Sequence, residues 1–144
     1  MIKSSEISKI FINFNNHNSI PSYIFQNRKY TILEALTVYL RERKKLSFRK
    51  ISALINRDLR YTYHSYQNAK KKELTTQYII QTKFIWIPLS IFTNRKLSAL
   101  EVLVSYLKEE FSLTYHEIAL LLKRDDRTIW TVYQRAGKKN VKPK

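Results

Sequence analysis

Arg60 and Arg127 have the side-chain chemistry best suited to recognising a nucleic-acid base. They stand at matching places of a sequence that repeats with a shift of 67 residues. A guanidinium group can donate two parallel hydrogen bonds to the edge of guanine, and it can also bind a phosphate. The neighbours of these arginines differ between the two copies, whereas the arginine is kept. This pattern makes Arg60 and Arg127 the leading candidates for a base contact.

The residues around both arginines are mostly polar types that contact base edges and phosphates. Threonine can contact either group, and lysine can hold a phosphate. Trp130 and Gln134 are expected to be ordinary solvent-exposed residues. The candidate contact set is Asp126, Arg127, Thr128, Thr131, Arg135, Lys138 and Lys139 in the second copy, and Arg60, Tyr61, His64, Ser65 and Asn68 in the first.

The other reactive residue types form no catalytic or metal-binding pattern. The three histidines, at positions 17, 64 and 116, are far apart and lack metal-ligand spacing. Adjacent acids at 109–110 and 125–126 point to different sides of a helix, which does not suit shared acid–base work. The tyrosines lack the Arg and His constellation of a recombinase, and the only glycine, Gly137, leaves no phosphate loop. We therefore expect no enzyme, no cofactor and no metal.

The elements that position the candidate residues also occur twice, because residues 20–72 align with residues 87–139 without a gap. A capping box has Ser or Thr at the start of a helix and Glu three residues later. Ser47 is followed by Lys50, so its cap is predicted to be weaker. Capping boxes are predicted at Thr31 to Glu34, Ser98 to Glu101 and Thr114 to Glu117.

A third helix is predicted in each copy after a short break, with Asp58 or Asp125 as its cap. Its inner face is predicted from apolar spacing of four and seven residues. Two helices joined by a short turn form the helix-turn-helix outline, and a plain three-helix bundle is the alternative. The predicted inner-face residues are Thr62, Tyr66 and Ala69 in the first copy, and Ile129, Tyr133 and Ala136 in the second.

The predicted fold is therefore all-α, with two tandem three-helix helix-turn-helix units and a short irregular or extended segment before each. Apolar stretches at residues 7–14 and 78–86 are expected to pack on the unit that follows, and they could pair as strands. The predicted segments are an amino-terminal segment (1–19), the first repeat (20–72), a linker (73–86), the second repeat (87–139) and a basic tail (140–144).

The net charge of +16, with ten Tyr, seven Phe and two Trp, favours nucleic acid as the partner. Residues 20–72 contain thirteen bases and three acids, whereas residues 87–139 contain nine bases and six acids. The first copy is thus expected to attract phosphate and the second to make selective contacts. The longest apolar run, 84–92, is too short to span a bilayer, and Met1-Ile-Lys begins no signal peptide. The absence of Cys fits a reducing compartment, so we expect a cytoplasmic, nucleoid-associated protein without a membrane partner.

A motif in the second copy is more specific. It reads Glu117-Ile118-Ala119-x-Leu121-Leu122, then Asp125-x-x-Thr128-Ile129-x-Thr131, then Arg135-Ala136-x-Lys138-Lys139. This motif resembles region 4 of bacterial sigma factors, which implies a helix-turn-helix that binds DNA and a link to promoters. Lys123 and Arg124 replace the glycine and the apolar residue of the family's turn, and Val132 stands where the family has an Arg that contacts DNA. The first copy keeps only Ile51, Leu54, Asp58, Ala69 and the lysines.

The combined interpretation is a sequence-specific double-stranded-DNA-binding protein that regulates transcription. Two units on one chain imitate the half-sites of a dimer, so a monomer that binds a direct-repeat or spaced target is expected. Three alternatives stay open. The chain could be a sigma-like promoter factor that works with RNA polymerase, or a DNA-binding subunit of a replication, recombination or mobile-element machine. It could instead be a protein–protein adaptor whose charge serves only solubility.

Overall fold

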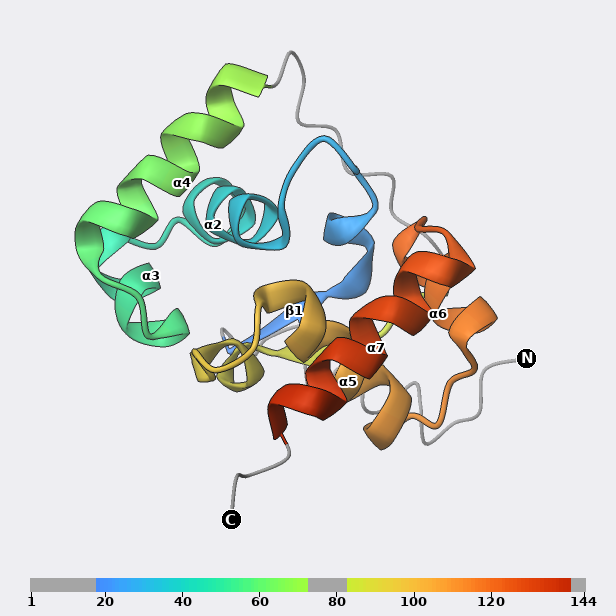
Figure 1. Ribbon diagram of the computed structural model, residues 1–144. Helices are drawn as coiled ribbons and strands as arrows, with labels where there is room; N and C mark the ends of the chain where they lie inside the picture. The colour runs from blue at the N-terminus through green and yellow to red at the C-terminus, as the bar shows by residue number, and fades with distance from the viewer. Residues whose placement is uncertain (1–17, 73–82, 141–144) are drawn as a thin grey trace.

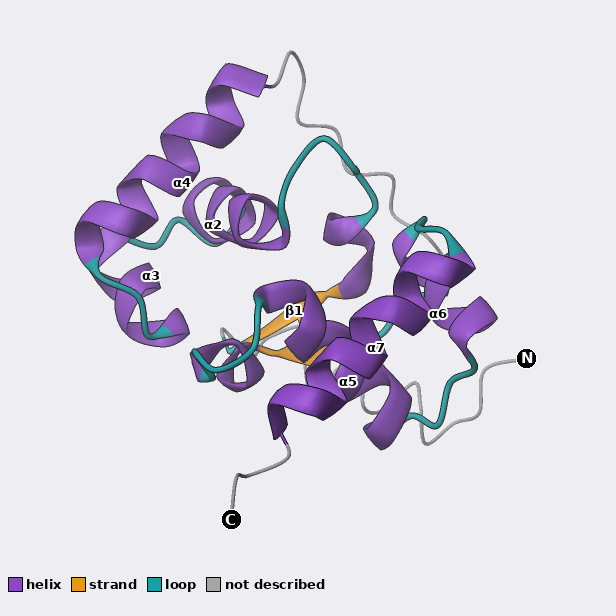
Figure 2. Ribbon diagram, viewed as in Figure 1, coloured by secondary structure: helices purple, strands orange, loops and turns teal. Residues whose placement is uncertain are grey.

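The computed structural model describes residues 18–72 and 83–140, and within them it confirms the predicted all-α class. Figure 1 shows the helices around a small strand pair, and Figure 2 separates helices from strands and loops. The helices are α2 (Ile32–Glu42), α3 (Phe48–Ile55), α4 (Leu59–Lys72), α5 (Ala99–Glu110), α6 (Tyr115–Leu122) and α7 (Asp126–Asn140). Each group of three is preceded by a strand and a 3₁₀ helix, which are β1 (Ser19–Pro21) with η1 (Ser22–Phe25), and β2 (Trp86–Pro88) with η2 (Leu89–Thr93).

The predicted helix starts are confirmed by their hydrogen bonds. The three expected capping boxes close at the amino ends of α2, α5 and α6. Ser47 caps α3 without a partner glutamate, as its sequence predicts. Each cap satisfies backbone N–H groups that have no acceptor inside the helix. These local contacts fix where the helices begin before any tertiary packing is considered.

Left-handed residues end the second helix of each group. Asn56 follows α3 with φ 53°, and Lys123 follows α6 with φ 51°. Lys123 therefore adopts a left-handed conformation of the kind that favours glycine, and the tight turn into α7 forms without a glycine. A second matching pair, Lys45 and Ser112, also has positive φ. The left-handed conformation costs an L-residue other than Gly about 1–2 kcal/mol.

The sequence did not predict the strand pair that joins the two copies. Strand β1 pairs with β2 in antiparallel orientation, with Ile20 opposite Ile87. Ile20 and Ile87 are the first residues of the two predicted repeats. The pairing that the sequence left open is a different one, between residues 7–14 and 78–86. Residues 7–14 and 78–82 lie outside the described part of the chain. Both 3₁₀ helices were also missed, because four or five residues are too few for a helical period to emerge.

One hydrophobic core joins the two groups of helices. Helix η1 packs against α2 of its own copy and α6 of the other, and η2 packs against α5 and α3 in the same way. The rings of Phe25 and Phe92 meet at the junction with their centroids 6.0 Å apart. The linked core therefore sets the position of one group relative to the other.

Candidate nucleic-acid interface

Helices α4 and α7 carry the candidate residues, and each lies on the other two helices of its copy. The Asp58 carboxylate accepts a hydrogen bond of 2.7 Å from the Tyr61 amide, which caps α4 as predicted. The predicted inner faces are confirmed at Thr62, Ala69, Ile129 and Ala136, which are buried. Tyr66 and Tyr133, which were also predicted to face inward, are half-buried and pack against the core. The faces opposite these residues are left to solvent, so each third helix presents one exposed side.

Most of the predicted contact residues lie on these exposed sides, as the burial of each residue shows. In α4 the exposed ones begin in the first turn and continue past the middle of the helix. In α7 they extend along the whole helix. The exposed candidates are Arg60, Tyr61, His64 and Asn68 on α4, and Asp126, Arg127, Thr128, Thr131, Arg135, Lys138 and Lys139 on α7.

The assignment of Ser65 to the contact surface was wrong. Its side chain is 7% exposed and lies on the inner face of α4. Val132, at the matching place in α7, is 6% exposed. Both residues follow Thr62 or Ile129 by three positions, which places them on the same buried side of the helix. At position 132 the sigma factor motif has an Arg that is expected to contact DNA. In this protein that position is occupied by Val132 and belongs to the core.

Lys139 has a structural partner that the sequence did not reveal. Its ammonium lies 2.8 Å from Oε1 of Glu101, which is 1% exposed, and Lys72 pairs with Glu34 at 2.7 Å in the first copy. Burial by itself would raise the pKa of Glu101, but hydrogen bonds from Lys139 and the Ser98 backbone outweigh burial and hold it below the usual value. Lys138 and Lys139 are both exposed, but Lys139 is paired with a buried carboxylate.

Asp126 also has a partner within the protein. Nδ1 of His116 on α6 lies 3.0 Å from its carboxylate, and both side chains are more than half exposed. A carboxylate in the first turn of a helix is favoured by the partial positive charge of that end. Asp126 therefore supports the start of α7, and it makes this exposed side less basic than that of α4, where Leu59 takes the matching place.

Exposed aromatic residues stand at equivalent positions of the two third helices, where the sequence had predicted the exposure of Trp130 but not of Tyr63. Tyr63 on α4 is 44% exposed and Trp130 on α7 is 51% exposed. These positions are equivalent in the two copies, and each lies three residues after Arg60 or Arg127. Residues three apart in a helix are neighbours on its surface. The signal was present in the aligned repeats, where an aromatic residue occupies both positions.

Basic residues also gather where the two copies meet. Arg57 donates to the carbonyl of Phe92 at 3.2 Å, and Arg124 donates to the carbonyl of Phe25 at 2.9 Å. Burial lowers the pKa of Arg57 and the nearby Arg95 guanidinium lowers it further. The pKa of Arg124 is lowered in the same way, by burial and by Arg28. These arginine pairs join the copies and place positive charge near the turn before each third helix.

An Asn-Arg-Lys segment occurs in each copy, at residues 27–29 and 94–96, and the asparagine side chain stabilises its backbone. Oδ1 of Asn27 accepts from the amide of Lys29 at 3.0 Å, and Oδ1 of Asn94 accepts from the amide of Lys96 at 2.9 Å. This arrangement is an Asx turn, in which an asparagine side chain holds the backbone two residues further on. The adjoining Arg and Lys side chains are exposed.

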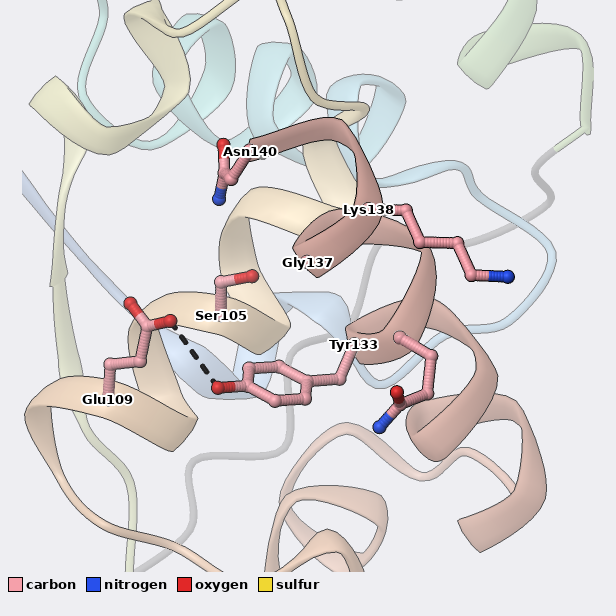
Figure 3. A pocket seen from close by; sticks show the side chains of 7 residues that line it. Ser105, Glu109, Tyr133, Gly137, Lys138 and Asn140 are labelled. Atoms are coloured by element: carbon pink, nitrogen blue, oxygen red, sulfur yellow. Dashed lines mark hydrogen bonds between the residues drawn. The ribbon is translucent and has the colours of Figure 1, made fainter. Parts of the chain in front are cut away.

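A shallow groove of about 250 Å³ lies between α5 and α7. In Figure 3 the Tyr133 hydroxyl donates to Glu109 across it, at 3.4 Å. Gly137 forms one edge, where the first copy has Lys70, whose ammonium lies 3.0 Å from Glu42. The groove therefore lies where a glycine stands in place of a lysine.

Among residues 18–72 and 83–140, no group of His, Asp and Glu side chains is arranged to hold a metal ion. None of the described helices has the length and apolar character that a bilayer crossing requires. No family model, curated protein or solved structure matches the chain.

Proposed function

We propose that the chain binds double-stranded DNA in a sequence-dependent way and regulates transcription from the nucleoid. The observation that carries the proposal is the exposed side of the two third helices. Each presents an arginine in its first turn and an aromatic residue one turn later, on a chain with a net charge of +16. The first residues of a recognition helix are those that reach base edges in the major groove.

The turns before these helices support the proposal. Residues 56–58 separate α3 from α4, and residues 123–125 separate α6 from α7. A turn of three or four residues is what a helix-turn-helix has at this place. The left-handed Lys123 supports the resemblance to sigma factor region 4, because it keeps the turn where the glycine is lost. The promoter-linked role and RNA polymerase as a partner rest on that resemblance.

The first experiment measures binding to random duplex DNA over a series of salt concentrations. Affinity should fall steeply, because the logarithm of the association constant changes by about 0.9 per phosphate contacted for each tenfold change in salt. Affinity that is flat between low and physiological salt would overturn DNA binding and leave the adaptor alternative. Retention of RNA polymerase from a lysate on the full chain would separate a sigma-like factor from a regulator that acts alone.

The second experiment compares Arg127→Ala with Lys71→Ala on a selected duplex and on a scrambled one. Lys71 is an exposed residue in the last turn of α4, so it is placed for phosphate rather than bases. Loss of an Arg–guanine pair should cost about 1–3 kcal/mol on the selected duplex only, whereas loss of a phosphate contact should weaken both duplexes and reduce the salt slope by about one. Equal weakening of both duplexes by Arg127→Ala would show that Arg127 reads no base.

A further inference from the structure

The two copies meet through equivalent residues. Ile20 and Ile87, which match in the repeat, face each other in the strand pair, and the strands are antiparallel. An antiparallel pair centred on equivalent residues is related by a local two-fold axis through that pair. Such an axis requires that each contact from the first copy to the second has a counterpart from the second to the first.

The arginine contacts at the junction obey this reciprocity, whereas the Gln26–Leu121 and Asn56–Thr93 bonds start from positions whose side chains differ between the copies. Arg57 of the first copy donates to Phe92 of the second, and the matching Arg124 of the second copy donates to the matching Phe25 of the first. The packing of η1 on α6 and of η2 on α3 exchanges the copies in the same way. In Figure 1, α4 and α7 accordingly lie on opposite sides of the strand pair and run in opposite senses. The copies are thus related by rotation, as in a symmetric dimer, although they belong to one chain.

We propose that the DNA target is an imperfect inverted repeat in which Arg60 and Arg127 read symmetry-related guanines on opposite strands. This inference rests on the proposed DNA binding. A two-fold axis of a protein aligns with a dyad of the duplex, which interchanges the two strands. A direct repeat, which the tandem sequence by itself suggests, would need copies related by translation, and the junction excludes that arrangement.

The inverted repeat in the DNA is expected to be imperfect, because the exposed sides of α4 and α7 differ around the shared arginine. Tyr61 and His64 on α4 are replaced by Thr128 and Thr131 on α7. A bulky aromatic or imidazole group and a threonine contact different base edges and methyl groups. The two half-sites therefore differ at these positions, and the arginine-bound guanine is where they agree.

The experiment selects bound sequences from a random duplex pool with the full chain and then maps guanine N7 methylation interference on the best site. Wild type is compared with Arg60→Ala and Arg127→Ala, and circular dichroism checks that each variant is folded. Each variant should lose interference at one guanine and bind about 5- to 150-fold more weakly, the range that corresponds to 1–3 kcal/mol. Arg43→Ala, which removes an exposed arginine outside the third helices, is the matched control and should alter no single guanine.

The inference is supported if the two variants lose methylation interference at two guanines that lie on opposite strands, equally distant from one centre. Two affected guanines on the same strand would overturn it, and so would interference lost for only one of the arginines. In both of those outcomes the proposed DNA binding would stand. An absence of duplex binding at every salt concentration would overturn the proposed function as well, so the two failures are distinguishable.

Discussion

Replacing Gly137 by alanine should stabilise the protein, although the residue lies in a helix that carries the candidate interface. Gly137 is inside α7, and a Cβ atom built there meets nothing within 4 Å. Its backbone has no positive φ that would require glycine. Glycine in a helix interior is less stable than alanine by about 0.5–1 kcal/mol, so that is the expected gain. The melting temperature should rise by about 1–4 °C for a chain of this size.

The first copy supplies a second variant for the same site. Lys70 stands at the matching position and lies 3.0 Å from Glu42, whose counterpart is Glu109. Gly137→Lys should therefore gain the same helix stability and a further few tenths of a kcal/mol, about what an exposed ion pair contributes. The coupling between Gly137→Lys and Glu109→Ala, measured in a double-mutant cycle, isolates that contribution.

Urea unfolding followed by circular dichroism measures both variants against wild type. Unchanged slopes would show that only stability has altered. If Gly137→Ala lowers the free energy of unfolding, the open space at this position is not what the structure describes.

Four other substitutions test the helix faces, the buried pair and the turn. Ile129→Asp should unfold the second group of helices, because an unpaired carboxylate in its fully buried place costs several kcal/mol, a large share of roughly 5–15 kcal/mol of total stability; a native circular dichroism spectrum would contradict this. Lys139→Met should lower the free energy of unfolding in urea by about 1–3 kcal/mol, which is less than for a fully buried ion pair because Lys139 is partly exposed. Lys138→Met is the control and should have little effect. The folded pKa of Glu101 lies below its usual value of 4.5, so the carboxylate contributes its full stabilisation above pH 4.5. The difference in unfolding free energy between wild type and Glu101→Gln should therefore shrink as the pH falls through the folded pKa. Lys123→Gly should raise the melting temperature, since it removes about 1–2 kcal/mol of left-handed strain against a smaller entropic cost.

Several predicted features are confirmed because their signals are local. A capping box joins residues three positions apart, so Thr114 and Glu117 identify the start of α6 without knowledge of any other part of the chain. The inner face of α7 follows from the spacing of Ile129 and Ala136 for the same reason. The position of Arg127 on the exposed side is a consequence of that face.

The candidate surface was predicted less well where a residue's environment depends on distant partners. Ser65 is polar and occupies a place that polar residues can share with solvent, but the packing of α4 on α2 and α3 buries it. Lys139 was assigned to phosphate because it belongs to a basic cluster. Its actual partner, Glu101, lies 38 residues away, and only the contact between α5 and α7 brings the two together.

The sequence by itself determined the two copies, the starts of their helices and the exposed arginine in each. Tertiary structure alone decided how the copies are arranged, because a gapless repeat is equally compatible with translation and with rotation. The antiparallel pairing of Ile20 with Ile87 selects rotation. Its hydrogen bonds join backbone atoms 67 residues apart, and backbone groups are the same in every residue type. The repeat pattern of the side chains therefore cannot predict this backbone pairing, and the rotational arrangement of the copies can be seen only in the fold.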